Sequence, residues 1–168
     1  LKVKLDINQG IKSCEINNGE ELKKALFDEI KYCDYLIMNS AVTDFKLKEE
    51  ILSKLPKHKL TDYFANNIEL VPDIMKSLTS LKENHQIFLA FCAFTGSFDN
   101  LKDIVQNKLD QKGCDLIFAN PIDIEGQGFG THSNNEGWLI NKDGTEDYLE
   151  KTSKLQLANQ LIDKITSI

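Results

Sequence analysis

Short apolar runs recur along the chain and predict buried strands. Continuous runs lie at residues 35–38, at 87–91 and within 115–120. A run that is apolar at every position is typical of a parallel strand with helices on both sides. Alternation of apolar and polar residues over 1–7 predicts a half-buried strand instead, and residues 11–16 are expected to form a second short one.

Segments with helical spacing follow several of these runs. Apolar residues recur at helical intervals over 20–32, where Asn18 can cap the amino end, and over 73–82, 98–112 and 155–165. Strands and helices therefore alternate. This pattern predicts an α/β class fold, a three-layer Rossmann-like sheet that is mostly parallel.

Two segments depart from the alternation. Near the end of the chain, residues 138–141 and 146–150 flank the Lys142-Asp143-Gly144 turn, which predicts a small hairpin before the closing helix. Residues 39–65 are polar, contain Pro56 and show no clean period, so they are expected to form a long, functional loop. With 168 residues in total, residues 1–168 are expected to form a single domain.

Composition narrows the class of protein. The net charge of -6 argues against a nucleic-acid partner, which requires a basic surface. No apolar run approaches the roughly 18 residues of a membrane span. The first residues lack the apolar core of a signal peptide, so a cytoplasmic location is expected. The four cysteines are expected to be reduced and buried, and the histidines have no ligand-like spacing, so no metal site is predicted. The chain does not start with Met and is expected to be part of something longer.

The ends of the predicted parallel strands are the places to look for a ligand site. Residues 39–45, 92–97 and 119–131 follow the three buried runs and are small, polar or glycine-rich. We expect them to gather at one edge of the sheet, where ligands bind in open α/β folds. The glycines of residues 126–130 do not form a Walker phosphate loop, so that segment alone is a weak motif.

Individual residues in and near these segments have two interpretations each. Asp44 is either a turn or capping residue, or a contact to a ribose or base. Lys54, Lys57 and Lys59 are either a solvated charge run, or part of a mobile basic loop that closes over phosphates.

Lys108 and Lys112 lie on the apolar stripe of their predicted helix, which Leu101, Ile104 and Val105 define. A lysine in this position either extends its ammonium to water or meets an anion. Lys108 would lie roughly 15 Å from the start of the helix. A site at the carboxyl edge of the sheet would then need a tilted helix or another subunit.

Several blocks occur in the order found in one enzyme family. They are Ala41-Val42-Thr43-Asp44-Phe45, Ser53-Lys54-Leu55-Pro56-Lys57, Pro72-Asp73-Ile74, Ala90-Phe91-Cys92-Ala93-Phe94-Thr95, Lys108 and Lys112 ahead of Asp115-Leu116-Ile117-Phe118-Ala119-Asn120, and Gly128-Phe129-Gly130-Thr131-His132-Ser133-Asn134. The ordered set resembles bacterial phosphopantothenoylcysteine synthetase, the phosphopantothenate–cysteine ligase of coenzyme A biosynthesis, and covers nearly the whole chain.

The resemblance implies a two-step ligation. The carboxylate of 4′-phosphopantothenate attacks the α-phosphate of CTP and releases pyrophosphate, and the amino group of cysteine then displaces CMP from the acyl-cytidylate. Mg²⁺ is expected with the nucleotide, and a homodimer with a flavin-dependent decarboxylase fused upstream is expected as the assembly. Lys54 would be the catalytic flap lysine. The residues that would hold the nucleotide are Asp44, Lys54, Pro72, Asp73, Ile74, Met75, Phe91, Lys108 and Lys112.

Some positions depart from the family pattern. Val71 replaces an asparagine, Phe94 a glutamate, Ala90 a glycine and His132 an acid. The first βα unit of the family, with an asparagine that serves the second half-reaction, is absent, so the chain alone is not expected to complete the ligation. One alternative is a degenerate relative that binds nucleotide without catalysis. Another is an unrelated dinucleotide-dependent oxidoreductase, although no G-x-G-x-x-G follows a predicted strand. The choice between CTP and ATP stays open.

Overall fold

Five strands form the central sheet of the protein. The computed structural model describes residues 10–49, 51, 53–127 and 133–168, so the predicted strand at 1–7 lies outside the described residues. The order across the sheet is β1-β4-β5-β6-β7. The strands are β1 (Tyr35–Met38), β4 (Ile87–Phe94), β5 (Leu116–Pro121), β6 (Asn134–Asn141) and β7 (Glu146–Ser153).

The sheet is mostly parallel, as the alternation of strands and helices predicted. β1 pairs with β4 and β4 with β5 in parallel, so the carboxyl ends of all three lie at the same edge. β6 runs antiparallel to β5, and β7 antiparallel to β6, so β6 is the one strand of this sheet that runs the other way. The β6–β7 hairpin turns at Gly144, which has a φ of 84° that favours glycine.

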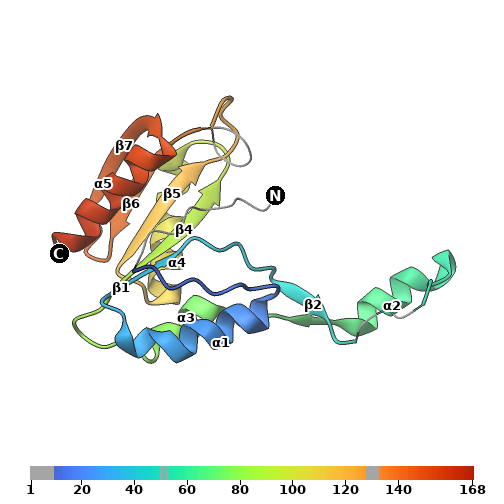
Figure 1. Ribbon diagram of the computed structural model, residues 1–168. Helices are drawn as coiled ribbons and strands as arrows, with labels where there is room; N and C mark the ends of the chain where they lie inside the picture. Colours follow the sequence, from blue (N-terminus) through green and yellow to red (C-terminus); the bar gives the residue numbers. More distant parts are fainter. Residues whose placement is uncertain (1–9, 50, 52, 128–132) are drawn as a thin grey trace.

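Helices cover both faces of the sheet (Figure 1). α1 (Gly19–Glu29), α3 (Ile74–Thr79) and α4 (Lys102–Lys112) pack on one face, where their apolar side chains join one core cluster. α5 (Lys154–Thr166) packs on the other face and completes a second cluster. The result is the predicted three-layer, Rossmann-like α/β fold. The closing helix, predicted at 155–165, forms one of the outer layers.

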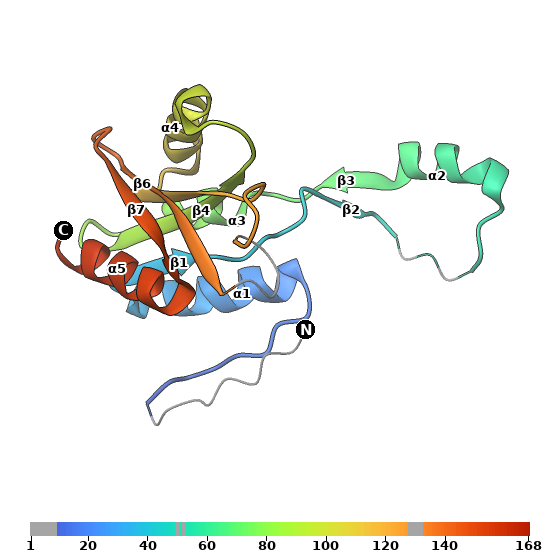
Figure 2. The same ribbon diagram turned by 90° about the horizontal axis from the view of Figure 1, so that it is seen from above.

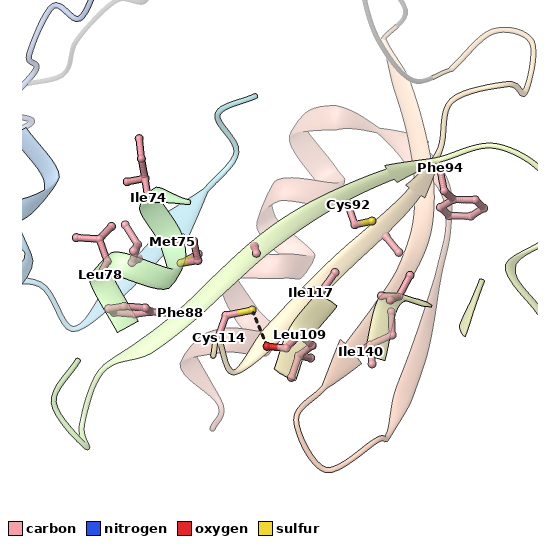
Figure 3. Close-up of a cluster of buried hydrophobic side chains, with 14 of the residues drawn as sticks. Ile74, Met75, Leu78, Phe88, Cys92, Phe94, Leu109, Cys114, Ile117 and Ile140 are labelled. Carbon is pink, nitrogen blue, oxygen red and sulfur yellow. Dashed lines mark hydrogen bonds between the residues drawn. The ribbon is translucent and has the colours of Figure 1, made fainter. Parts of the chain in front are cut away.

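β4 shows why the buried strands are apolar at nearly every position. Phe88 and Cys92 point into the cluster beneath α3 and α4, as Figure 3 shows, while Leu89 and Phe91 point into the cluster beneath α5. Because helices cover both faces of the sheet, the residues that point to either face are removed from water. The strand continues to Phe94, three residues past the predicted end, because Phe94 also packs into the first cluster.

The polar segment at residues 39–65 was expected to be a loop, and that expectation is wrong for much of it. It contains β2 (Phe45–Leu47), the 3-10 turn η2 (Lys57–Lys59) and most of α2 (Leu60–Asn67). β2 pairs antiparallel with β3 (Ile68–Leu70) to form a separate ribbon. We call residues 44–71 the arm, because both views show it projecting from the body (Figures 1 and 2). Strands of three residues are too short to show the alternation of apolar and polar residues that would have predicted them.

Other element boundaries differ in detail from those expected. The predicted strand at 11–16 does not form, and those residues have no regular secondary structure. Asn18 does cap α1, since its side-chain oxygen accepts a hydrogen bond from the Glu21 N–H at 2.9 Å. The predicted helix at 98–112 is divided into the 3-10 turn η3 (Phe98–Asn100) and α4, which begins at Lys102.

Candidate functional site

A cleft lies at the carboxyl end of β1. It consists of two adjoining cavities of about 500 and 200 Å³ that share the loop at residues 40–43 as lining. The amino end of α1 borders the larger cavity, and the amino end of α3 borders both. The cleft therefore lies where ligands bind in parallel sheets, beyond the ends of the strands.

Six of the nine predicted nucleotide-binding residues line the smaller cavity. The ones brought together there are Asp44, Pro72, Asp73, Ile74, Met75 and Lys112. They come from three segments that are distant in sequence: the root of the arm, the start of α3 and the end of α4. Ile74 and Met75 are buried and anchor the start of α3 in the core. The Val71 N–H donates to the Asp44 carbonyl oxygen at 2.9 Å, which closes the root of the arm.

Asp73 has two structural partners within this cavity. Its Oδ1 accepts a hydrogen bond from the Lys76 N–H at 3.0 Å and caps α3, while its Oδ2 pairs with Lys112 Nζ at 2.5 Å. Burial raises the pKa of Asp73, but the hydrogen bonds from Lys112 and from the Lys76 N–H outweigh it and hold the pKa below its ordinary value. The carboxylate is therefore ionised at neutral pH and neutralises Lys112, which also lines the smaller cavity.

The length of α3 explains how Lys112 reaches the cleft from the far end of α4. The two helices meet at their carboxyl ends, where Thr79 Oγ1 donates to the Lys112 carbonyl oxygen at 2.9 Å. The six residues of α3 span only about 9 Å. The long side chain of Lys112 can therefore extend back along α3 to Asp73.

Lys108 lies outside the lining of the cleft but points toward the same edge. Its side chain is exposed, and its Nζ lies 3.6 Å from the Sγ of Cys92 on β4. The predicted distance from the helix start was too long because α4 begins at Lys102, four residues later than expected. Neither a tilted helix nor another subunit is needed to bring this lysine toward the carboxyl half of β4.

The structure does not bring Phe91 and Lys54 to the cleft. Phe91 is half-buried on the opposite face of the sheet, beneath α5, where its ring meets Phe118 edge-on with centroids 5.6 Å apart. Lys54 is exposed on the arm, between β2 and η2. These two side chains therefore lie away from the cleft in this conformation, and their roles at the nucleotide stay predictions.

The remaining departures from the family pattern have different surroundings. Phe94 is buried against Phe98 and Trp138, with centroids 6.1 and 6.0 Å away, so an acid at this position is replaced by a core side chain. His132 and the glycines 128 and 130 lie outside the described residues. Gln127, just before them, is buried, and its Nε2 donates to Glu136 Oε1 at 3.2 Å.

The larger cavity contains residues that the sequence patterns did not single out. Lys23 and Lys46 line it, together with Glu20 at the start of α1. The Lys46 ammonium lies 3.0 Å from Glu20 and 3.4 Å from Glu69, and these partners raise the pKa of Lys46. These charges converge only in three dimensions, because α1 and the arm are far apart in sequence.

The cysteines are buried less uniformly than expected. Cys92 and Cys114 are buried and Cys33 is half-buried, but Cys14 is exposed, so the prediction of a buried thiol is wrong for Cys14. Burial raises the pKa of Cys114 to about 11. Its Sγ lies 4.0 Å from the Leu109 carbonyl oxygen, within the core (Figure 3).

The fold and the cleft define a Rossmann-like α/β domain with a candidate ligand site at the carboxyl edge of its parallel strands. The chain belongs to the family described as the DNA/pantothenate metabolism flavoprotein C-terminal domain, which it matches over residues 2–168. This finding confirms the family that the sequence resembles.

Individual relatives agree with this assignment. The chain is 28% identical over 165 residues to the coenzyme A biosynthesis bifunctional protein CoaBC of Mycobacterium tuberculosis, covering 94% of this chain and 38% of the relative. It is 29% identical over 156 residues to CoaBC of Vibrio cholerae, covering 93% and 38%. The chain thus spans less than half the length of these curated relatives. A crystal structure of the C-terminal domain of CoaBC matches the fold with a TM-score of 0.72 at 23% identity, covering 97% of this chain and 70% of that one.

The ion pair between Lys112 and Asp73 gives a testable pH dependence of stability. Lys112 and the Lys76 N–H hold the folded pKa of Asp73 below its ordinary value, so the stabilisation is present above the unfolded pKa and is lost as the pH falls through the folded one. We expect Lys112→Met to lower the free energy of unfolding by up to about 1 kcal/mol at pH 7, because the pair is partly exposed. The difference from the wild type should shrink below about pH 4.

Urea unfolding between pH 7 and pH 3 measures this difference. Lys108→Met is the matched control, since Lys108 contacts a thiol instead of a carboxylate. A difference for Lys112→Met that stayed constant with pH would contradict the assigned partner.

Proposed function

We propose that this chain forms the nucleotide-holding portion of a ligase that joins 4′-phosphopantothenate to cysteine through an acyl-cytidylate made from CTP. One observation carries the proposal. The blocks around Asp44, at Pro72–Met75 and at Lys112 are far apart in sequence, yet they meet in one cleft at the carboxyl edge of the sheet. Membership of the family and homology to coenzyme A biosynthesis proteins support the same assignment.

The chemistry of the proposed first step sets what the site must supply. A carboxylate that attacks a triphosphate brings two anions together, so cations must neutralise the charge that develops. Lys54 is the proposed catalytic group, while Asp44 and residues 72–75 are proposed to hold the sugar and base. Lys108 and Lys112 are proposed to bind nucleotide after release from Cys92 and Asp73. Phe91 is proposed to contact the nucleotide through its backbone, since its ring lies on the far face.

The expected Mg²⁺ fits the residues as an ion bound chiefly to the nucleotide. The described part of the chain contains no group of three or more His, Cys, Asp or Glu side chains that could hold a metal ion. Mg²⁺ is often bound through substrate phosphates with few protein ligands. It would neutralise phosphate charge in the cleft.

Further parts of the proposal concern the whole protein. We propose a cytoplasmic homodimer with a flavin-dependent decarboxylase upstream. The bifunctional relatives, of whose length this chain matches 38%, support the fused domain. Within the described residues, no helix is both long and apolar enough to cross a bilayer.

A second candidate function is nucleotide binding without catalysis. The burial of Phe94 among aromatic side chains, at a position where the family has an acid, favours this alternative. The neutralisation of Lys112 by Asp73 also favours it, since a paired lysine offers less charge to a phosphate.

Ligand choice tests the proposal directly. We expect calorimetric titration with CTP, ATP and NAD, each with Mg²⁺, to show CTP binding at least about tenfold more tightly than NAD, a difference of about 1.4 kcal/mol. The converging Asp44 and Pro72–Met75 segments are the reason for this order. Binding of NAD without binding of CTP would overturn the ligase assignment and favour an oxidoreductase. Equal affinity for CTP and ATP would leave the ligase assignment standing and contradict only the preference for CTP.

A further inference from the structure

A buried thiol of the chain touches a lysine side chain. The Sγ of Cys92 on β4 lies 3.6 Å from the Nζ of Lys108 on α4. The other three cysteines contact backbone carbonyl oxygens instead, and they are Cys14, Cys33 and Cys114. Among the residues that the structure describes, the contact at Cys92 is therefore the one hydrogen bond between a cysteine and a lysine.

This contact lies at the boundary between the core and water. Cys92 is only 8% exposed and belongs to the core cluster beneath α4 (Figure 3), whereas Lys108 is exposed. The sulfur is therefore enclosed, and the nitrogen marks the side from which a small oxidant such as dioxygen reaches it. A second molecule that carries a thiol is much larger, and the same packing hinders its approach. Groups held in contact by a fold react far faster than free ones, because their encounter needs no further loss of entropy.

Neither member of the pair has a partner that would divert it. The other lysines of α4 form ion pairs with acids, but Lys108 forms none within the described residues. Cys114, the other buried thiol, is too distant for a disulfide. Cys92 pairs with Ala119 on β5, and Cys114 precedes Ala119 by on the order of 15 Å of extended chain. Because a disulfide needs Cα atoms within about 7 Å, Lys108 is the group with which Cys92 can form a covalent link.

We propose that Cys92 and Lys108 form a reversible oxidative cross-link, in which an oxygen atom bridges the sulfur and the nitrogen. Lys108 first gives a proton to water and becomes a neutral amine. An N–H bond and the S–H bond then break, an N–O bond and an O–S bond form, and dioxygen supplies the bridging atom. The other atom of dioxygen leaves as water, with the hydrogens that the amine and the thiol release. Nitrogen and sulfur are oxidised in this step, and dioxygen is reduced to the oxidation level of water.

The cross-link removes a positive charge from the proposed nucleotide site. The bridged nitrogen of Lys108 is no longer an ammonium, and it is tied to β4, so it cannot turn toward a phosphate. Thiols open the bridge: they return the hydrogens that restore the amine and the thiol and release water, and they are themselves oxidised pairwise to disulfides. Free cysteine, the amino-acid substrate of the proposed ligase, is such a thiol, so a supply of reduced cysteine keeps the site open. This consequence rests on the proposed function, whereas the cross-link itself does not.

Mass spectrometry of the oxidised chain tests the cross-link. The reduced chain is freed of dithiothreitol and kept in oxygen-saturated buffer. We expect the folded chain to become about 14 Da heavier, because it gains an oxygen atom and loses two hydrogens, and to return to its first mass in dithiothreitol. Digestion should give two peptides joined through Cys92 and Lys108. A gain of about 16 or 32 Da on Cys92 without a cross-link, or no oxidation of Cys92, would overturn the proposal.

Matched variants separate the cross-link from ordinary oxidation of thiols. Cys92→Ser keeps a hydrogen-bonding group beside the lysine, and Lys108→Arg keeps the positive charge, but neither is expected to form the bridge. Cys33→Ser removes a half-buried thiol that contacts a carbonyl oxygen, and it should form the bridge as the wild type does. The wild type unfolded in urea should not form it, because the two side chains are no longer held together. An equal yield in the unfolded chain would contradict the assignment of this reaction to the folded contact.

Calorimetric titration with CTP and Mg²⁺ tests the effect on the proposed site. We expect the cross-linked chain to bind CTP at least about tenfold more weakly than the reduced chain, because a charge-assisted contact is lost, and dithiothreitol to restore the affinity. Cys92→Ser should bind CTP equally before and after exposure to oxygen. Equal affinities of the cross-linked and the reduced wild type would overturn the effect on the site. Failure of the reduced chain to bind CTP would instead overturn the proposed function and leave the cross-link intact, since mass spectrometry detects it without nucleotide.

Discussion

Lys54→Gln is expected to slow formation of the acyl-cytidylate by about a hundredfold or more, while the affinity for CTP changes by less than about tenfold. A group that acts mainly as charge develops affects the rate more than binding. Removing one preorganised charge typically raises the barrier by about 2.7–4 kcal/mol. The exposed position of Lys54 on the arm agrees with this division, since the residue holds no other part of the fold in place.

Release of pyrophosphate from CTP in the presence of 4′-phosphopantothenate measures this rate in the full-length protein. Lys57→Gln is the matched control, because Lys57 lies three residues away on the same exposed segment. It should lower the rate far less. An unchanged rate of pyrophosphate release in Lys54→Gln would remove the catalytic role assigned to Lys54.

Gly137→Ala is expected to lower the free energy of unfolding by about 3 kcal/mol, at the upper end of the range for overpacking a core. Gly137 lies in β6 where the register shifts, and it lets this strand approach β5 closely. A Cβ at this position would overlap the Ala119 carbonyl oxygen and lie 2.7 Å from the Phe118 ring. Neither group can move away easily, since both residues are fully buried at the centre of the sheet.

Thermal unfolding should show this effect as a loss of roughly 10 °C in Tm. Gly19→Ala serves as the control, because a Cβ at the start of α1 would meet only the Val42 side chain, at 3.3 Å. That change should stay within about 1 kcal/mol. Comparable losses for both variants would show that β6 can shift to accept the methyl group.

Much of the fold could be predicted from the sequence because burial leaves a strong local signal. The run at 35–38 is identical with β1, and the runs at 87–91 and 115–120 identify β4 and β5. Strands covered on both faces are apolar at successive positions, and the short length of these runs favours strands over helices. The hairpin turn at Gly144 was likewise predictable, since its backbone conformation favours glycine.

The arm could not be predicted in the same way. Its two strands have three residues each, which is too few for a period of two to be distinguished from chance. None of the residues in β2, α2 or β3 is buried, so packing against the core gives its apolar residues no pattern. The predicted loop was therefore correct in being a distinct, polar segment and wrong in its secondary structure.

The candidate site was predictable only as a set of separate residues. The sequence by itself determined the α/β class, the edge of the sheet where a ligand would bind, and the ordered blocks that identify the family. Only the tertiary structure decided that Lys112 pairs with Asp73, that Phe91 faces away from the cleft and that Lys54 lies on an arm, between β2 and η2. The physical reason is that strand and helix patterns depend on neighbours within a few residues, whereas these placements depend on where a six-residue helix ends and on which face of a sheet a side chain meets.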